Sequence, residues 1–173
     1  AVALQIKDSI ALQREALENL IGTMCEMAER ERDTVMLGRT HGQAAVPITF
    51  GLKVAVWVDE FARHLERLSE LMPRATTGKF LGAVGTGAAQ GEKAFELQSL
   101  IMGELGLGTP VATTQVVGRD RYIEWVGWMA NVATSVEKVL QEVRNLQRSE
   151  ISEVAEAFDV DKQVGSSTMA HKR

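Results

Sequence analysis

Hydrophobic residues recur every three or four positions along most of the chain, and the pattern is clearest between residues 122 and 146. This alternation of steps is typical of the buried face of a helix in a bundle. Val126, Ala133 and Leu140 widen that face. The pattern predicts a helix from about Arg119 to Gln147, about 43 Å long at ~1.5 Å per residue. Its apolar positions are Tyr122, Trp125, Met129, Val132, Val136, Val139, Val143 and Leu146.

Three earlier segments also predict helices. The first carries the same spacing from Ala3 to Met27, with Gln13 as its only polar member. The second runs from about Thr49 to Leu71, and its polar face ends at Pro73. A shorter helix is expected from about Glu92 to Leu105. No stretch alternates with period two for long enough to predict a strand. The sequence therefore predicts an all-α fold, a long up-and-down bundle whose helices cross at shallow angles.

Composition narrows the class of protein. The chain has 173 residues, of which 45% are hydrophobic and 24% charged, and its formal net charge is −4. Charges of both signs are mixed along the chain, which argues against a nucleic-acid surface, and no apolar run approaches the ~20 residues of a membrane span. The single cysteine, Cys25, excludes an internal disulfide and favours the reducing cytoplasm. The cysteine and histidine spacing predicts no metal site, and no cofactor is expected.

Three polar or glycine-rich connections, residues 34–48, 76–91 and 159–173, separate the predicted helices. Such loops at the end of a rigid scaffold are where sites are usually built. The first contains Thr40 and His41, followed by Gly42 and Gln43. A histidine can donate or accept a proton near neutral pH, so His41 is a candidate acid or base. The alternative is a capping loop whose polar groups satisfy helix ends.

The second connection has five glycines between Gly78 and Gly91. Glycines let a backbone approach an anion closely, but the segment matches no nucleotide-phosphate motif, and a tight turn between helices explains most of it. Gln115, which precedes the longest helix, could bind a carboxylate or an amide. Arg119, Asp120 and Arg121 are expected to be charges of a first helical turn with local ion pairs, and His64 a solvated residue on a charged face.

The last connection contains Ser166, Ser167 and Lys172 and is expected to be mobile, because Met169 is its only apolar anchor. A serine acts as a base only beside groups that stabilise its alkoxide. Composition alone favours a solvated tail here.

Taken together, these loops resemble the fumarase/aspartase superfamily of lyases, and within it the adenylosuccinate lyases of archaeal or bacterial type. The resemblance covers the chain in order. It is carried by Arg39–Gln43, Gly82–Thr86, Gln115 with Arg119–Arg121, and Gly165–Met169 with His171–Arg173, and supported by Arg144–Ile151 and Lys162–Val164.

The resemblance implies a lyase that eliminates fumarate from adenylosuccinate and from the succinylated ribotide of purine biosynthesis, without a cofactor. Ser166 would abstract the proton next to the substrate carboxylate, and His41 would protonate the departing nitrogen. Lys172 would stabilise the negative charge of the carbanion-like intermediate. The residues expected to hold the substrate are Thr40, Gln115 and Ser167. A base, an acid on the opposite side and a fixed cation are the groups that such an elimination needs.

The resemblance also implies a homotetramer with a twenty-helix core, in which each active site takes loops from three subunits. Ala170 stands where the family's loop has proline, and Gly87 where a larger residue is common. The chain begins after a loop that supplies a second histidine and stops before the asparagine and proline that usually follow Arg173. We therefore expect residues 1–173 to be the central helical domain of a longer enzyme, with its terminal domains absent and little activity by itself.

Two kinds of alternative stay open at this point. One is another member of the superfamily, such as an argininosuccinate lyase or a carboxymuconate cycloisomerase. The cycloisomerases share the Gly-Ser-Ser-Thr-Met loop but typically lack a histidine at the position of His41, so His41 favours the lyase. The other is a catalytically silent helical scaffold, against which Ser166, His41 and Lys172 count.

Overall fold

The computed structural model describes residues 1–155, 157–159 and 165–169 of the chain. The chain divides into two compact units, Ala1–Ala133 and Thr134–Arg173, and the boundary lies inside helix α4 (Asp120–Leu146). The prediction of a mainly helical fold is confirmed. The expected organisation as one central domain stays a prediction.

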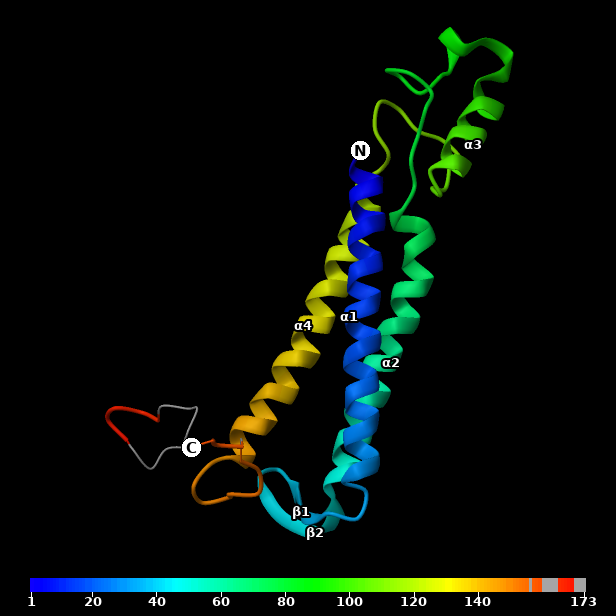
Figure 1. Cartoon of the computed structure of the whole chain (residues 1–173). Coiled ribbons are helices and arrows are strands. Elements are labelled where there is room, and N and C mark those ends of the chain that lie inside the picture. The colour runs from blue at the N-terminus through cyan, green and yellow to red at the C-terminus, as the bar shows by residue number, and fades with distance from the viewer. Residues whose placement is uncertain (156, 160–164, 170–173) are drawn as a thin grey trace. The chain divides into compact units, whose positions relative to one another are not determined.

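Helices α1 (Val2–Arg30) and α2 (Phe50–Ala75) pack side by side in the first unit (Figure 1). Both bury the apolar faces that their spacing predicts, since Ile6 and Ile10 of α1 and Phe61 of α2 are nearly inaccessible to solvent. Gly51 brings the start of α2 against the end of α1, because a Cβ at this position would lie 2.5 Å from the carbonyl oxygen of Ala28. The two helices therefore approach each other closely where the chain reverses direction.

Helix α2 begins where the pattern predicts but does not end there. Thr49 caps the helix by accepting a hydrogen bond from the N–H of Leu52. At the other end the helix continues through Pro73 to Ala75, so the expected end near Leu71 is wrong. Because Pro73 lies in the last turn, its missing N–H removes one hydrogen bond from a helix that stops two residues later.

His64 is buried, and the expectation of a solvated histidine is wrong. Only 1% of its surface is exposed. Its carbonyl oxygen accepts a hydrogen bond of 2.9 Å from the indole Nε1 of Trp128, and its ring lies 6.0 Å from that of Phe61, centroid to centroid. Trp128 belongs to α4, so a helix distant in the sequence packs over this part of α2.

Helix α4 has the predicted boundaries to within one residue and also contacts α1. Trp125 Nε1 donates to Oε1 of Gln13 at 2.9 Å, and Gln13 Nε2 donates to the sulfur of Met129 at 3.1 Å. These bonds explain the polar residue on the apolar face of α1. Val126 and Leu140 are more than half exposed, so the described part of the chain does not cover the widened part of the α4 face.

The connection between α1 and α2 is a β-hairpin, so the prediction that it contains no strand is wrong. Strands β1 (Val35–Thr40) and β2 (Gln43–Thr49) pair antiparallel. The register shifts between Leu37 and Arg39, and a Cβ on the intervening Gly38 would collide with the Val46 carbonyl. This irregularity interrupts the period-two alternation by which a strand is recognised in a sequence.

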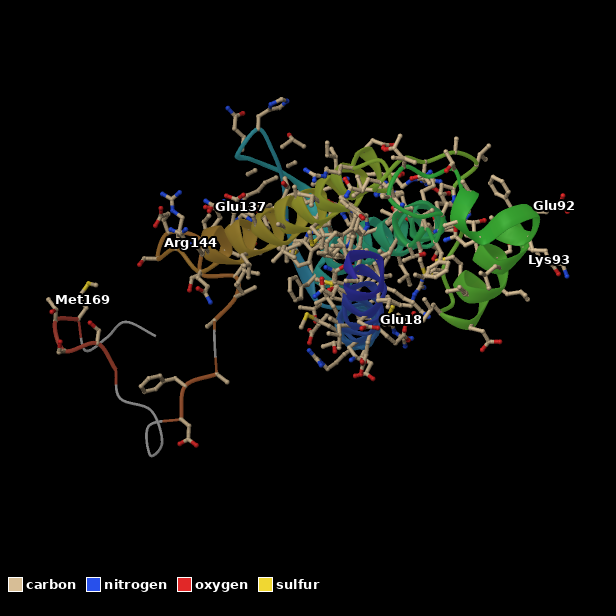
Figure 2. The ribbon with its side chains drawn as sticks, turned by 90° about the horizontal axis from the view of Figure 1, so that it is seen from above. Glu18, Glu92, Lys93, Glu137, Arg144 and Met169 are labelled. Atoms are coloured by element: carbon tan, nitrogen blue, oxygen red, sulfur yellow. The ribbon has the colours of Figure 1, made fainter. Side chains whose placement is uncertain are left out.

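The shorter helix is found close to the predicted place. Helix α3 (Ala94–Glu104) follows the 3-10 turn η1 (Ala88–Lys93). Figure 2 shows Glu92 and Lys93 projecting from the outer side of this turn and Glu18 projecting from α1, as expected for solvated charges. No helix in the described part of the chain is both long and apolar enough to cross a membrane.

Candidate functional site

Thr40 and His41 lie at the tip of the hairpin. Thr40 pairs with Gln43, which leaves His41 and Gly42 as the two central residues of the turn. Their φ angles are 54° and 72°, and positive φ at both positions is the signature of the turn that best matches strand twist. Histidine tolerates this backbone region better than most residues, and such strain often marks functional positions. The hairpin therefore presents an exposed imidazole beside a hydroxyl.

Gln115 lies at the opposite end of α2. The carbonyl oxygen of its neighbour Thr114 accepts a hydrogen bond of 3.0 Å from Nζ of Lys79, which follows α2 by four residues. The hairpin joins the other end of that helix, whose 26 residues span about 39 Å. Figure 1 shows the hairpin at the end of the α1–α2 pair opposite α3. One chain therefore does not bring His41 and Gln115 together.

The charges at the start of α4 connect helices rather than forming local ion pairs only. Arg121 Nη1 donates to the carbonyl oxygen of Arg74 at 3.2 Å and to the hydroxyl of Thr77 at 3.4 Å. One turn on, Glu124 accepts hydrogen bonds from Nε of Arg74 at 3.0 and 2.9 Å. These bonds lower the pKa of the Glu124 carboxyl from its ordinary 4.5 and raise the pKa of Arg74. The end of α2 is thus held against the start of α4.

The glycine-rich segment is a long connection rather than the tight turn expected. It runs from the end of α2 to η1, and the turn Thr76–Gly78 pairs through its backbone with Gly108. Lys79, which the sequence reasoning passed over, donates hydrogen bonds to the carbonyls of Gly82 and Thr114. The sequence signal that could have indicated this role is a single lysine in a glycine-rich segment, because glycines leave backbone carbonyls accessible to a hydrogen-bond donor.

Ser166 and Ser167 lie in the second unit. The N–H of Met169 donates to Oγ of Ser166 at 3.2 Å, and Ser166 is partly buried while Ser167 is exposed. This bond spans three residues and fixes the hydroxyl oxygen of Ser166 within its own loop. Lys172 lies outside the described residues, as do Ala170 and the segments 162–164 and 171–173 of the resemblance.

One cleft in the first unit is lined mostly by residues of α1 and α2. A cleft of about 340 Å³ lies where α1 ends and α2 begins, lined by Cys25, Ala28, Glu29, Arg32, Thr49, Gly51, Leu52, Ala55 and Val58. It contains none of the predicted site residues. Within the described ranges, no group of three or more His, Cys, Asp or Glu side chains is placed to hold a metal ion.

Comparisons with known proteins agree on one family. A family model described as lyase matches residues 1–173. The chain is 51% identical over its whole length to an adenylosuccinate lyase of Pyrococcus abyssi, of which it covers 38%. It is 41% identical over 170 residues, 98% of the chain, to an N-acetyl-S-(2-succino)cysteine lyase of Enterococcus italicus, of which it covers 37%.

A solved structure shares the fold. The fumarate lyase of Mesorhizobium sp. BNC1 superposes with a TM-score of 0.80 at 38% identity, over 89% of this chain and 36% of that one. The chain therefore spans well under half the length of the relatives it matches.

Proposed function

Because this chain belongs to the lyase family, whose model matches all 173 residues, we propose that it is part of a C–N lyase of purine biosynthesis. The substrates are adenylosuccinate and the related succinylated ribotide, and fumarate is the common product. The observation that carries the proposal is the likeness to an adenylosuccinate lyase along the whole chain. The exposed imidazole at the hairpin tip supports it, because the elimination needs a proton donor for the leaving nitrogen.

The proposed mechanism divides the elimination among the residues named above. Ser166 Oγ takes the proton from the carbon next to the carboxylate, the new C=C bond forms, and the C–N bond breaks as His41 protonates the nitrogen. Lys172 stabilises the charge that gathers on the carboxylate in between. Thr40, Gln115 and Ser167 hold the substrate. The position of Ser166 in the Gly165–Met169 motif that carries the family resemblance supports the assignment of the base.

The proposed assembly is a homotetramer whose active sites are shared between subunits. Two observations support it. The exposed apolar residues Ile123, Val126 and Leu140 give α4 a surface that another copy would cover. His41 and Gln115 lie at opposite ends of α2, so a site that uses both needs more than one chain. We also propose a cytoplasmic location, which suits a free, exposed Cys25.

A substrate panel tests the activity. The complete protein should release fumarate from adenylosuccinate, followed by the change in purine absorbance. The panel also contains argininosuccinate, N-acetyl-S-(2-succino)cysteine and carboxymuconate. Turnover of one of these without turnover of adenylosuccinate would overturn the proposed substrate, and no turnover at all would favour a silent scaffold.

Variants of the complete protein test the mechanism. Ser166→Ala and His41→Ala should each lower kcat at least ~10²-fold, because proton transfer by a positioned group contributes that much or more. Ser99→Ala is the matched control, since Ser99 is an exposed serine of α3 away from the site. Full activity of either site variant would remove that residue from the mechanism.

A further inference from the structure

Lys79 joins two segments that are far apart in the sequence, and the proposed mechanism does not use it. Its Nζ donates one hydrogen bond to the carbonyl oxygen of Gly82 in the glycine-rich segment. A second goes to the carbonyl oxygen of Thr114, 3.0 Å away and 35 residues later. The second acceptor immediately precedes Gln115. A half-buried lysine therefore holds the backbone next to a proposed substrate-binding residue.

The backbone of Lys79 is itself fixed on both sides. The N–H of Gly78 donates to the carbonyl oxygen of Gly108 at 2.9 Å. The N–H of Phe80 donates at 2.8 Å to Oε1 of Gln98, a side chain that is only 2% exposed. The ammonium group therefore extends from an anchored point, which makes it suited to restrain a more exposed loop.

The two segments that Lys79 joins also touch directly. Gly85 has φ 79°, and a Cβ there would collide with the carbonyl of Thr113 and lie 2.9 Å from that of Thr114. Glycine at this position lets the two backbones come into contact. Beyond Gln115, the side chain of Val117 is buried. The exposed Gln115 is thus presented between two restrained positions.

We propose that Lys79 is a positioning residue for Gln115: it holds the Thr113–Gln115 backbone against the glycine-rich segment, so that the Gln115 amide is oriented to bind substrate before substrate arrives. The proposal rests on the proposed function, because Gln115 receives its role there. Both acceptors are neutral carbonyls, so Lys79 acts through its N–H donors. Pre-organisation of this kind improves binding by removing the cost of ordering the loop.

Steady-state kinetics of the complete protein test the role. Lys79→Met keeps the aliphatic stem and removes the donors, and it should raise KM for adenylosuccinate about tenfold, as expected for the loss of ordering hydrogen bonds, with a smaller change in kcat. Lys79→Arg keeps donors at this position and should restore most of the loss. Lys93→Met is the matched control, because Lys93 projects outward from η1 (Figure 2), and it should leave both constants unchanged.

A double-mutant cycle separates positioning of Gln115 from a general loss of stability. If Lys79 acts through Gln115, Lys79→Met should add little to the KM of Gln115→Ala. Fully additive effects of the two substitutions would overturn the proposal, as would an unchanged KM in Lys79→Met.

Hydrogen exchange provides a readout that does not depend on turnover. The amides of residues 113–116 should exchange faster in Lys79→Met than in the wild type, while those of α1 and α2 are unchanged. Unchanged exchange at 113–116 would overturn the restraint, even in an active enzyme. If exchange is faster in Lys79→Met but the wild-type protein releases no fumarate, the restraint by Lys79 is supported and the proposed function is overturned.

Discussion

At the scale of single residues, Gly87 is constrained both by its backbone and by its neighbours. Its φ is 69°, and a Cβ would lie 2.5 Å from the Cβ of Ala94 and 3.2 Å from Cδ2 of Leu81. Both neighbours are themselves buried. The structure thus explains why this chain has glycine where the family resemblance led us to expect a larger residue: the left-handed backbone at the start of η1 leaves no room for one.

Replacing Gly87 with alanine should therefore destabilise the protein by about 1–3 kcal/mol, the usual cost of holding a side chain in a strained backbone conformation. Urea unfolding measures the change. Gly22→Ala is the matched control, because Gly22 lies within α1 with nothing near its missing Cβ. Alanine there should be neutral or stabilising by up to about 1 kcal/mol. A Gly87→Ala protein as stable as the wild type would contradict the packing around η1.

At this scale, the sequence predicts a residue's environment only where neighbouring residues in the sequence provide it. Gln13 was correctly placed on the buried face of α1 because that placement needs only the helical period. Its partners Trp125 and Met129 lie more than a hundred residues away and leave no mark on the local pattern. His64 was misplaced for the same reason, since α4 supplies what covers it. The strands of the hairpin were not predicted because the register shifts at Gly38, which interrupts the alternation of their side chains.

At the scale of elements, α2 and α4 are joined by a buried hydrogen bond and by an ion pair. Trp128 donates to the carbonyl oxygen of His64 in the middle of α2, and the Arg74–Glu124 pair connects the end of α2 to the first turns of α4. The pair is partly exposed, with 53% of the arginine side chain and 39% of the glutamate side chain accessible. Solvent therefore screens it, and its contribution to stability should be small but dependent on pH.

The direction of that pH dependence follows from the lowered pKa of Glu124. A group whose pKa is lower in the folded state stabilises the fold above its unfolded pKa and loses this effect as the pH falls through its folded pKa. Glu124→Gln should therefore lower Tm slightly at neutral pH and lose this effect once the pH is below the folded pKa of Glu124. Thermal unfolding at several pH values checks it, with Glu26→Gln as control. A deficit that persists in acid would show that charge is not the cause.

At the scale of the whole molecule, the predicted site residues belong to different segments of the chain. The hairpin carries Thr40 and His41, the far end of α2 lies near Gln115, and the second unit carries Ser166 and Ser167. The sequence indicated which loops hold these residues, because polar and glycine-rich segments stand out among helices. It could not show how these segments are arranged in space, because contacts between residues far apart in the sequence leave no mark on the local pattern.

Mixing variants of the complete protein tests this arrangement. His41→Ala and Gln115→Ala should each be impaired alone. Subunits mixed one to one should recover roughly a quarter of the wild-type sites, since a site with both residues intact draws them from different chains in a closed oligomer. Activity is measured after the subunits have exchanged, with each variant treated alone as control. Mixtures that exchange subunits but stay impaired would contradict the shared site.

The length of α2 has a consequence for how such a protein can change over generations. The two ends of α2 are about 39 Å apart, so under the proposed assembly His41 and Gln115 of one chain serve two different active sites. A mutation near Lys79 and Gln115 then acts beside the His41 of a neighbouring copy rather than beside that of its own chain. A compensating change in the hairpin would therefore act across a subunit boundary, although both mutations are inherited in one chain.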